Sequence, residues 1–140
     1  MSLPHLQIKD VMSPAPWTCA SSDSLHDAQE AMVRHGIRHL PVLDGAQLLG
    51  VLSERDVAVA LSLKGANAKN TTAGEVCARD LYVSHPESPL AEVVAAMAAH
   101  RYGSAVITSG GDTVGIFTTT DACRALAGLL TPGSDLLAHR

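Results

Sequence analysis

Hydrophobic and polar positions along this chain recur at a spacing of 65 residues. When residues 11–61 are placed over residues 76–126, the two stretches align without a gap. The identical pairs are Val11/Val76, Leu25/Leu90, Ala31/Ala96, Met32/Met97, His35/His100, Gly45/Gly110, Gly50/Gly115, Asp56/Asp121, Ala60/Ala125 and Leu61/Leu126. A register kept over roughly 50 residues predicts one supersecondary unit used twice. Because one unit of this size leaves an apolar face exposed, we expect the copies to meet about an approximate twofold axis, with a ligand cleft between them.

The pattern within each copy predicts the order strand, helix, strand, strand, helix. In the first copy the predicted elements are an extended piece at 17–19, a helix from 25 to about 35, strands at 40–43 and 48–52, and a helix at 54–63. In the second copy they are a helix from about 89, strands at 105–108 and 114–117, and a helix at 119–130. Asp23 and Ser88 are the predicted N-caps of the first helix of each copy, with Pro89 in the first helical position.

These elements predict two domains, at residues 8–63 and 73–130. The polar stretch KGANAKNTT at 64–72 is the expected linker, and a tail follows at 131–140, where Pro132 and Gly133 break the helix.

Composition and charge narrow the class of protein. Apolar residues make up 46% of the 140 residues but aromatic residues only 3%, so Ala, Val and Leu must fill the core. A net charge of −4 argues against a nucleic-acid partner. No apolar stretch is long enough to span a membrane, and the start MSLPHLQIKD lacks the apolar run of a signal peptide. Cys19, Cys77 and Cys123 have no CxxC spacing, which indicates reduced thiols in a cytoplasmic protein.

The same short string ends the last predicted strand of each copy. Ser53 and Asp56 in the first copy correspond to Thr118 and Asp121 in the second, each pair spanning the start of a helix. Free N–H groups at a helix N-terminus attract phosphate, and a carboxylate can accept both hydroxyls of a ribose, so the string suits a nucleoside ligand. It also fits a capping box, in which the hydroxyl and the carboxylate satisfy the helix's own N–H groups. The spacing alone leaves both interpretations open.

Three stretches carry a resemblance to a known family. The segments DVMSP, GIRHLPVLDGAQLLGVLSERDV and YGSAVITSGGDTVGIFTTTDA resemble a tandem pair of CBS domains, the Bateman module. The resemblance covers residues 8 to 130, and the second copy lacks the Leu-Pro before its strand and the Arg before its Asp. It implies an α/β (α+β) fold of two pseudo-twofold-related β-α-β-β-α units packed sheet to sheet. It also implies a regulatory module similar to small bacterial CBS proteins with no attached enzyme.

The resemblance further implies two clefts for adenosine-containing ligands such as AMP, ADP, ATP, NAD or S-adenosylmethionine. The first would be lined by Ser53, Asp56, Arg38, His39, Tyr82, Val83 and Ser84. The second would be lined by Thr118, Asp121, Ser104, Trp17, Thr18, Cys19 and Ile37. Ribose is expected on Asp56 and phosphate near Arg38 and His39. Gly103 and Ser104 replace these basic residues in the second cleft, where an uncharged or cationic nucleoside would fit better.

Other classes of function have less support in the sequence. The cysteines lack a catalytic signature, and there is no Walker loop or GxSxG, so we expect neither an enzyme nor a required cofactor. No His-x₃-His or CxxC cluster indicates a metal site, although a metal-binding protein or a ligand-free dimerisation module remain alternatives. Family members pair into disk-like dimers, and we expect a homodimer here, through helix faces that carry Ala28, Met32, Val94, Met97 and Ala98. An unidentified regulated protein is a further expected partner.

Overall fold

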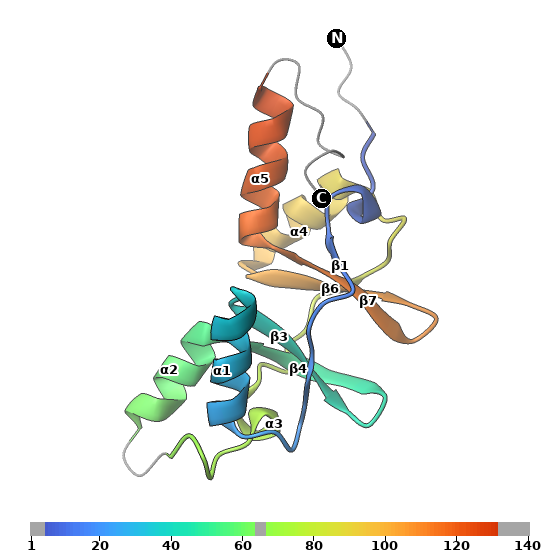
Figure 1. Cartoon of the computed structure of the whole chain (residues 1–140). Helices are drawn as coiled ribbons and strands as arrows, with labels where there is room; N and C mark the ends of the chain where they lie inside the picture. The colour runs from blue at the N-terminus through green and yellow to red at the C-terminus, as the bar shows by residue number, and fades with distance from the viewer. Residues whose placement is uncertain (1–4, 64–66, 132–140) are drawn as a thin grey trace. The chain divides into compact units, whose positions relative to one another are not determined.

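The computed structural model describes residues 5–63 and 67–131, which form a mixed α+β fold with two sheets (Figure 1). These residues fall into two compact units. The first-repeat unit comprises the described residues between Trp17 and Leu81, and the second-repeat unit comprises the described residues up to Pro16 and from Tyr82 onward. The predicted fold class is confirmed as mixed α+β, and each unit is described by itself below.

In the first-repeat unit a sheet of strand order β2-β3-β4 is covered by helices. The strands are β2 (Cys19–Ala20), β3 (His39–Asp44) and β4 (Gln47–Ser53), and the helices are α1 (Leu25–His35), α2 (Glu54–Ser62) and α3 (Ala73–Val76). β2 is parallel to β3, and β3 is antiparallel to β4 through the turn at Gly45. The helices α1 and α2 lie side by side against this sheet in Figure 1. Leu25, Leu40 and Leu52 are fully buried in its core.

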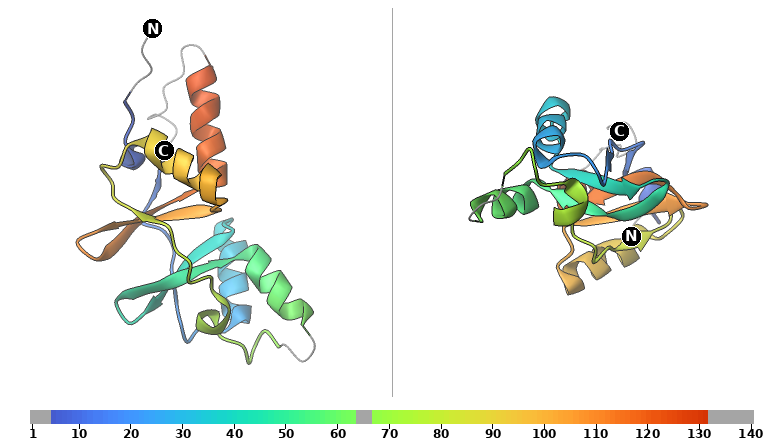
Figure 2. Two further views of the ribbon diagram at one scale, coloured as in Figure 1. Left: turned by 180° about the vertical axis from the view of Figure 1, so that it is seen from behind. Right: turned by 90° about the horizontal axis from the view of Figure 1, so that it is seen from below.

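The second-repeat unit has a sheet of order β1-β7-β6-β5. The strands are β1 (Ser13–Pro14), β5 (Val83–Ser84), β6 (Ser104–Ser109) and β7 (Asp112–Thr118), and the helices are η1 (Ile8–Asp10), α4 (Leu90–His100) and α5 (Thr119–Leu130). The antiparallel hairpins β3–β4 and β6–β7 both extend as long ribbons in the two views of Figure 2. Phe117, Ile8 and Ile107 are fully buried, so the lone phenylalanine of the chain anchors this core.

Each unit takes its leading segment from the other copy. We call residues 8–14 and 73–79 the leading segments, since each lies at the start of its copy. Residues 8–14 pack in the second-repeat unit and residues 73–79 in the first-repeat unit. The hydrogen bonds repeat at the 65-residue spacing: Ile8 N donates to Ser88 O at 2.8 Å, and Ala73 N donates to Asp23 O at 2.8 Å. The sequence pattern does not predict this exchange of the leading segments between the two units.

Two equivalent glycines let the leading segments approach the sheets. A Cβ atom on Gly50 would lie 2.5 Å from the carbonyl oxygen of Ala78 and 2.8 Å from Cys77 Sγ. The equivalent Cβ on Gly115 would contact Met12 Sδ. Val51 and Ala78 exchange two backbone hydrogen bonds at 3.0 and 2.9 Å beside the first of these contacts. Glycine is therefore needed at residue 50, where the backbone of the leading segment occupies the space of a side chain, whereas at residue 115 that space is filled by the side chain of Met12.

Most predicted elements agree with the structure, but two N-caps were wrong. The side chain of Ser24 caps α1 by accepting from Asp27 N, while Asp23 instead accepts from Ala20 N. Pro89 is the N-cap of α4, so Ser88 lies one residue outside and its hydroxyl accepts from His85 N. At α1 two neighbouring polar residues, Asp23 and Ser24, could each serve as the cap, whereas at α4 no side chain caps the helix. In both cases a one-residue shift leaves the apolar periodicity unchanged.

The helix face predicted for dimerisation is also partly wrong. Ala28, Met32 and Met97 are buried in the cores of their own units. They share the helical face of Leu25, Leu90 and Val93, which packs on the sheet. The exposed large apolar side chains of the helices are instead Val33, Val59, Leu126, Leu129 and Leu130.

Among the described residues, no helix is both long and apolar enough to cross a membrane.

We expect Gly50→Ala to be more destabilising than Gly115→Ala. The new methyl group at residue 50 meets the backbone of Ala78, which cannot move without breaking its pairing with Val51. At residue 115 it meets the flexible side chain of Met12, which can turn away. Overpacking typically costs about 1–3 kcal/mol, and the loss at residue 50 should fall in that range. The intrinsic change from glycine to alanine is the same at both positions and cancels. Urea unfolding of the two variants measures the difference; equal losses would contradict it.

Candidate functional site

Both Ser/Thr-x-x-Asp strings form complete capping boxes. Asp56 N donates to Ser53 Oγ at 3.0 Å, and Ser53 N donates to Asp56 Oδ2 at 3.1 Å. In the second copy Asp121 N donates to Thr118 Oγ1 at 3.3 Å, and Thr118 N donates to Asp121 Oδ2 at 2.9 Å. The capping interpretation is therefore correct for both helices. It leaves a ligand role open only for the atoms that capping does not use.

The backbone at these helix starts is already hydrogen-bonded. Glu54 N donates to the carbonyl oxygen of Arg38 at 2.9 Å, and Thr119 N donates to that of Gly103 at 3.2 Å. With the amides of Asp56 and Asp121 bound to the capping hydroxyls, most of the first turn has partners. The expectation that free N–H groups there attract phosphate is therefore weakened, and side-chain cations must supply the attraction.

The structure brings Ser53, Asp56, Arg38 and His39 together in the first-repeat unit. His39 and Ser53 are directly opposed in the β3–β4 ladder, and Arg38 precedes His39 at the end of the loop after α1. Asp56 is half-buried and accepts one hydrogen bond among the described residues, from Ser53 N. Its Oδ1 remains able to accept from a ligand. His39 has a contact of its own within the structure.

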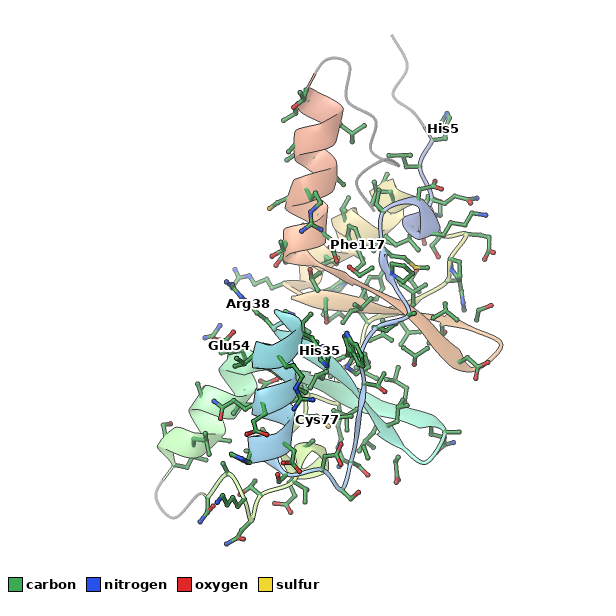
Figure 3. All side chains as sticks on the ribbon, in the orientation of Figure 1. His5, His35, Arg38, Glu54, Cys77 and Phe117 are labelled. Carbon is green, nitrogen blue, oxygen red and sulfur yellow. The ribbon has the colours of Figure 1, made fainter. Side chains whose placement is uncertain are left out.

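Arg38 is a loosely held cation. Its side chain is 79% exposed, and its Nε lies 3.9 Å from Glu54 Oε2, at the outer limit of an ion pair (Figure 3). A pair this long and exposed contributes little to stability. The terminal guanidinium nitrogens are therefore available to an anionic ligand, which suits bidentate contact with a phosphate.

Asp121 has a different environment although it occupies the equivalent position. Its side chain is 7% exposed, and Arg124 Nη1 donates to Oδ1 at 2.9 Å. Thr118 Oγ1 donates to Oδ2 at 3.2 Å, and Ser13 Oγ from β1 lies 3.4 and 3.5 Å from the two oxygens. The two aspartates are thus equal in sequence spacing and unequal in free acceptor capacity.

Aromatic rings flank the ends of α1 and α4 in both copies. Trp17, 58% exposed, stacks on His35 with ring centroids 3.7 Å apart and planes at 8°. Tyr82 stacks on Tyr102 at 5.1 Å, and Tyr102 on His100 at 5.3 Å. Burial raises the pKa of the Tyr82 hydroxyl, with Glu92 and Tyr102 adding to the rise. One face of Trp17 is therefore covered by histidine, and the indole still presents a large exposed area.

The remaining predicted ligand residues divide between the units. In the second-repeat unit, Tyr82 and Ser104 are half-buried, Val83 is 41% exposed, and Ser84 is buried, donating to Ser88 Oγ at 2.7 Å. Ser104 is opposed to Thr118 in the ladder. In the first-repeat unit, Thr18 is exposed, Ile37 is half-buried and Cys19 is buried. That residues of the two units combine in common clefts stays a prediction.

The described residues form hollows of two kinds near the ends of the helices, one beside the Asp56 site and one apart from it. One of about 310 Å³ is bounded by α1, the loop after it and the start of α2, and includes Ile37, Arg38 and Glu54 but neither Ser53 nor Asp56. The other, of about 830 Å³, is an apolar groove between α4, α5 and residues 5–7, and it contains none of the predicted ligand residues. The smaller hollow therefore adjoins the Asp56 site, whereas the larger is a separate surface.

One group of possible metal ligands was not predicted. The ligand atoms of His26, Asp27 and Glu30 on α1 all lie within 4.8 Å of one another. His26 Nε2 and Glu30 Oε1 are 3.3 Å apart, and their side chains are 43% and 57% exposed, as an i,i+4 pair on a helix surface. The spacing H-x₃-E could have identified the group, but as an exposed ion pair it has an ordinary structural explanation.

Comparison with known families explains the duplication. The family model of the CBS domain matches residues 8–63 and again 73–128. The chain therefore belongs to the CBS-domain family and carries the domain twice, as a tandem pair.

Relatives of known sequence or structure agree with this assignment. The chain is 31% identical over 130 residues to L-aspartate semialdehyde sulfurtransferase of Methanocaldococcus jannaschii, covering 91% of this chain but 25% of that protein. It is 26% identical to the CBS domain-containing protein YhcV of Bacillus subtilis, covering 81% of each. The solved CBS domain pair of protein MJ0100, in complex with 5′-methylthioadenosine and S-adenosyl-L-methionine, is 28% identical with a TM-score of 0.81, covering 89% and 98% of the two chains. The chain thus spans only a quarter of the relative that is named as an enzyme.

We expect one cysteine of three to react in the folded protein. Burial raises the pKa of the Cys19 thiol to about 11, and Asp23 and Cys77 contribute to the rise, so at pH 8 almost no reactive thiolate forms there. Cys77 is also buried, whereas Cys123 is exposed on α5. Because Cys123 also lines the apolar groove between α4 and α5, the titration uses protein dilute enough to be monomeric. A thiol reagent at pH 8 should then modify about one thiol per chain, and all three after unfolding. Cys123→Ser is the control and should leave the folded protein unreactive. Rapid modification of Cys19 would contradict its burial.

Proposed function

We propose that this protein is a regulatory module that binds an adenosine-containing ligand, with Asp56 accepting the ribose hydroxyls. The observation that carries the proposal is the half-buried Asp56 carboxylate, which caps its helix through Oδ2 and has no hydrogen bond at Oδ1 among the described residues. The proposed ligands are AMP, ADP, ATP, NAD or S-adenosylmethionine. The complex of the MJ0100 domain pair with two adenosyl ligands supports this class of ligand.

The chemistry of the site suits binding and not turnover. Ser53 Oγ accepts from Asp56 N and keeps its own proton to donate, while Asp56 accepts from a ribose diol. Arg38 offers charge to a phosphate or carboxylate of the ligand. The cleft partners from the second-repeat unit are part of the proposal: Tyr82, Val83 and Ser84. In this proposal the protein acts in the cytoplasm, and ligand binding changes its contacts with a regulated protein partner.

We further propose that two copies associate through the apolar groove of the second-repeat unit. The groove is lined along α4 and α5 by Ala91, Val94, Ala122, Leu126 and Leu129. Small residues allow helices to approach closely, and Leu126 is 56% exposed beside them. Burying such a surface against the same surface of a second copy gives a C2 homodimer.

Calorimetric titration with each proposed ligand tests the function. If Asp56 holds the ribose, Asp56→Ala removes up to two charge-assisted hydrogen bonds, and affinity should fall tenfold or more. The variant also loses a capping box, at a cost of about 1 kcal/mol. Ser24→Ala is the matched control, because it removes the cap of α1 at a similar cost and should leave affinity unchanged. Failure of every adenosyl ligand to bind would overturn the proposal.

A second arm of the same titration examines Arg38. Arg38→Ala should weaken AMP far more than adenosine, because only AMP brings a phosphate to the guanidinium. Equal weakening of both ligands would place Arg38 away from the phosphate.

Sedimentation at micromolar concentration tests the dimer. Leu126→Glu places a charge in the groove and should give a monomer, because burying an unpaired carboxylate opposes association. Ala127→Glu adds the same charge at the next, exposed position, which does not line the groove, and should remain dimeric. A monomeric unmodified protein would overturn the proposal.

A further inference from the structure

The two equivalent aspartates differ in how many of their acceptor sites are used. A carboxylate offers about four lone-pair sites to hydrogen-bond donors. Asp56 accepts from one donor among the described residues, Ser53 N. Asp121 has four donors around it: Thr118 N, Thr118 Oγ1, Arg124 Nη1 and Ser13 Oγ. The local spacing that both share does not produce this difference.

The extra donors of Asp121 come from outside its capping box. Arg124 lies one turn along α5 at 2.9 Å, and its counterpart in the first copy is Val59, which has no donor. Ser13 lies on β1, 108 residues away in sequence, and shares a long contact with both oxygens. Ala78, the counterpart of Ser13, also lacks a side-chain donor. The first copy therefore cannot build the same arrangement.

We infer that Asp121 is an internal clasp that ties β1 to α5, so that the chain offers one ribose-accepting carboxylate, Asp56. This inference rests on the proposed function for its ligand but not for the clasp itself. A ribose diol that approached Asp121 would have to displace Arg124 from a carboxylate that is 7% exposed. The hydroxyl of Thr118 is also engaged, because it donates to Asp121 Oδ2 and accepts from Asp121 N. Arg124 and Ser13 are thus positioning residues that decide how many nucleosides bind.

Adenosine separates this explanation from a simpler one. The second copy has Gly103 and Ser104 where the first has Arg38 and His39, so poor binding of AMP there could come from the missing cation alone. Because adenosine carries no phosphate, the presence or absence of that cation does not change its affinity. If only the cation mattered, adenosine would occupy two sites per chain. If Arg124 and Ser13 occupy the acceptor sites of Asp121, adenosine binds at one site per chain.

Equilibrium dialysis with saturating labelled adenosine is the test. The unmodified protein should bind one adenosine per chain. The double variant Ser13→Ala/Arg124→Ala frees two of the four acceptor sites and should bind two. Two equivalents bound to the unmodified protein would overturn the clasp. So would a double variant that still binds one, because Arg124 and Ser13 would then not be what limits binding.

Thermal melts test the clasp without any ligand. Asp121→Asn should lower the melting temperature by roughly 3–6 °C, and the matched variant Asp56→Asn by less than half as much. Arg124→Ala should have a smaller effect when combined with Asp121→Asn than alone, as expected for groups in contact. Equal effects at the two aspartates, or additive effects of the pair, would overturn the clasp. If no adenosine binds while these melts behave as stated, the proposed function fails and the clasp stands.

Discussion

The fold depends on the exchanged leading segments. Residues 8–14 complete the unit built from the second copy, and residues 73–79 complete the unit built from the first. Gly50 and Gly115 help the segments to approach, because a Cβ atom there would meet the backbone of Ala78 or the side chain of Met12. The repeated hydrogen bonds at Ile8 and Ala73 fix the segments in the same register. Neither copy forms its complete unit from its own contiguous stretch.

The exchange of leading segments also determines which hydrogen-bond donors reach the aspartates at the starts of α2 and α5. Ser13 reaches Asp121 only because residues 8–14 lie beside β7, where Ser13 is paired with Ile116. In the other unit Ala78 is paired with Val51 at the equivalent place and brings no donor. The same exchange of leading segments in both units therefore leaves the two aspartate carboxylates in chemically different surroundings. The difference lies in side chains that the duplication did not preserve.

Capping and ligand binding are compatible at these positions. A capping box uses the hydroxyl as acceptor and one carboxylate oxygen, which leaves the hydroxyl proton and the second oxygen for a ligand. The choice between a structural and a functional interpretation, which the sequence leaves open, is therefore not exclusive for Ser53 and Asp56. For Thr118 and Asp121 the remaining atoms are engaged within the unit.

The sequence by itself determined the duplication, the order of the main elements and both Ser/Thr-x-x-Asp helix starts. These features follow from hydrophobic periodicity and helix capping, which involve residues close together in the sequence and can therefore be identified from it. Only the tertiary structure decided which unit each leading segment joins, that Trp17 stacks on His35, and that Ser13 reaches Asp121. Such contacts join residues as far as 108 positions apart, and no local pattern specifies a partner at that distance.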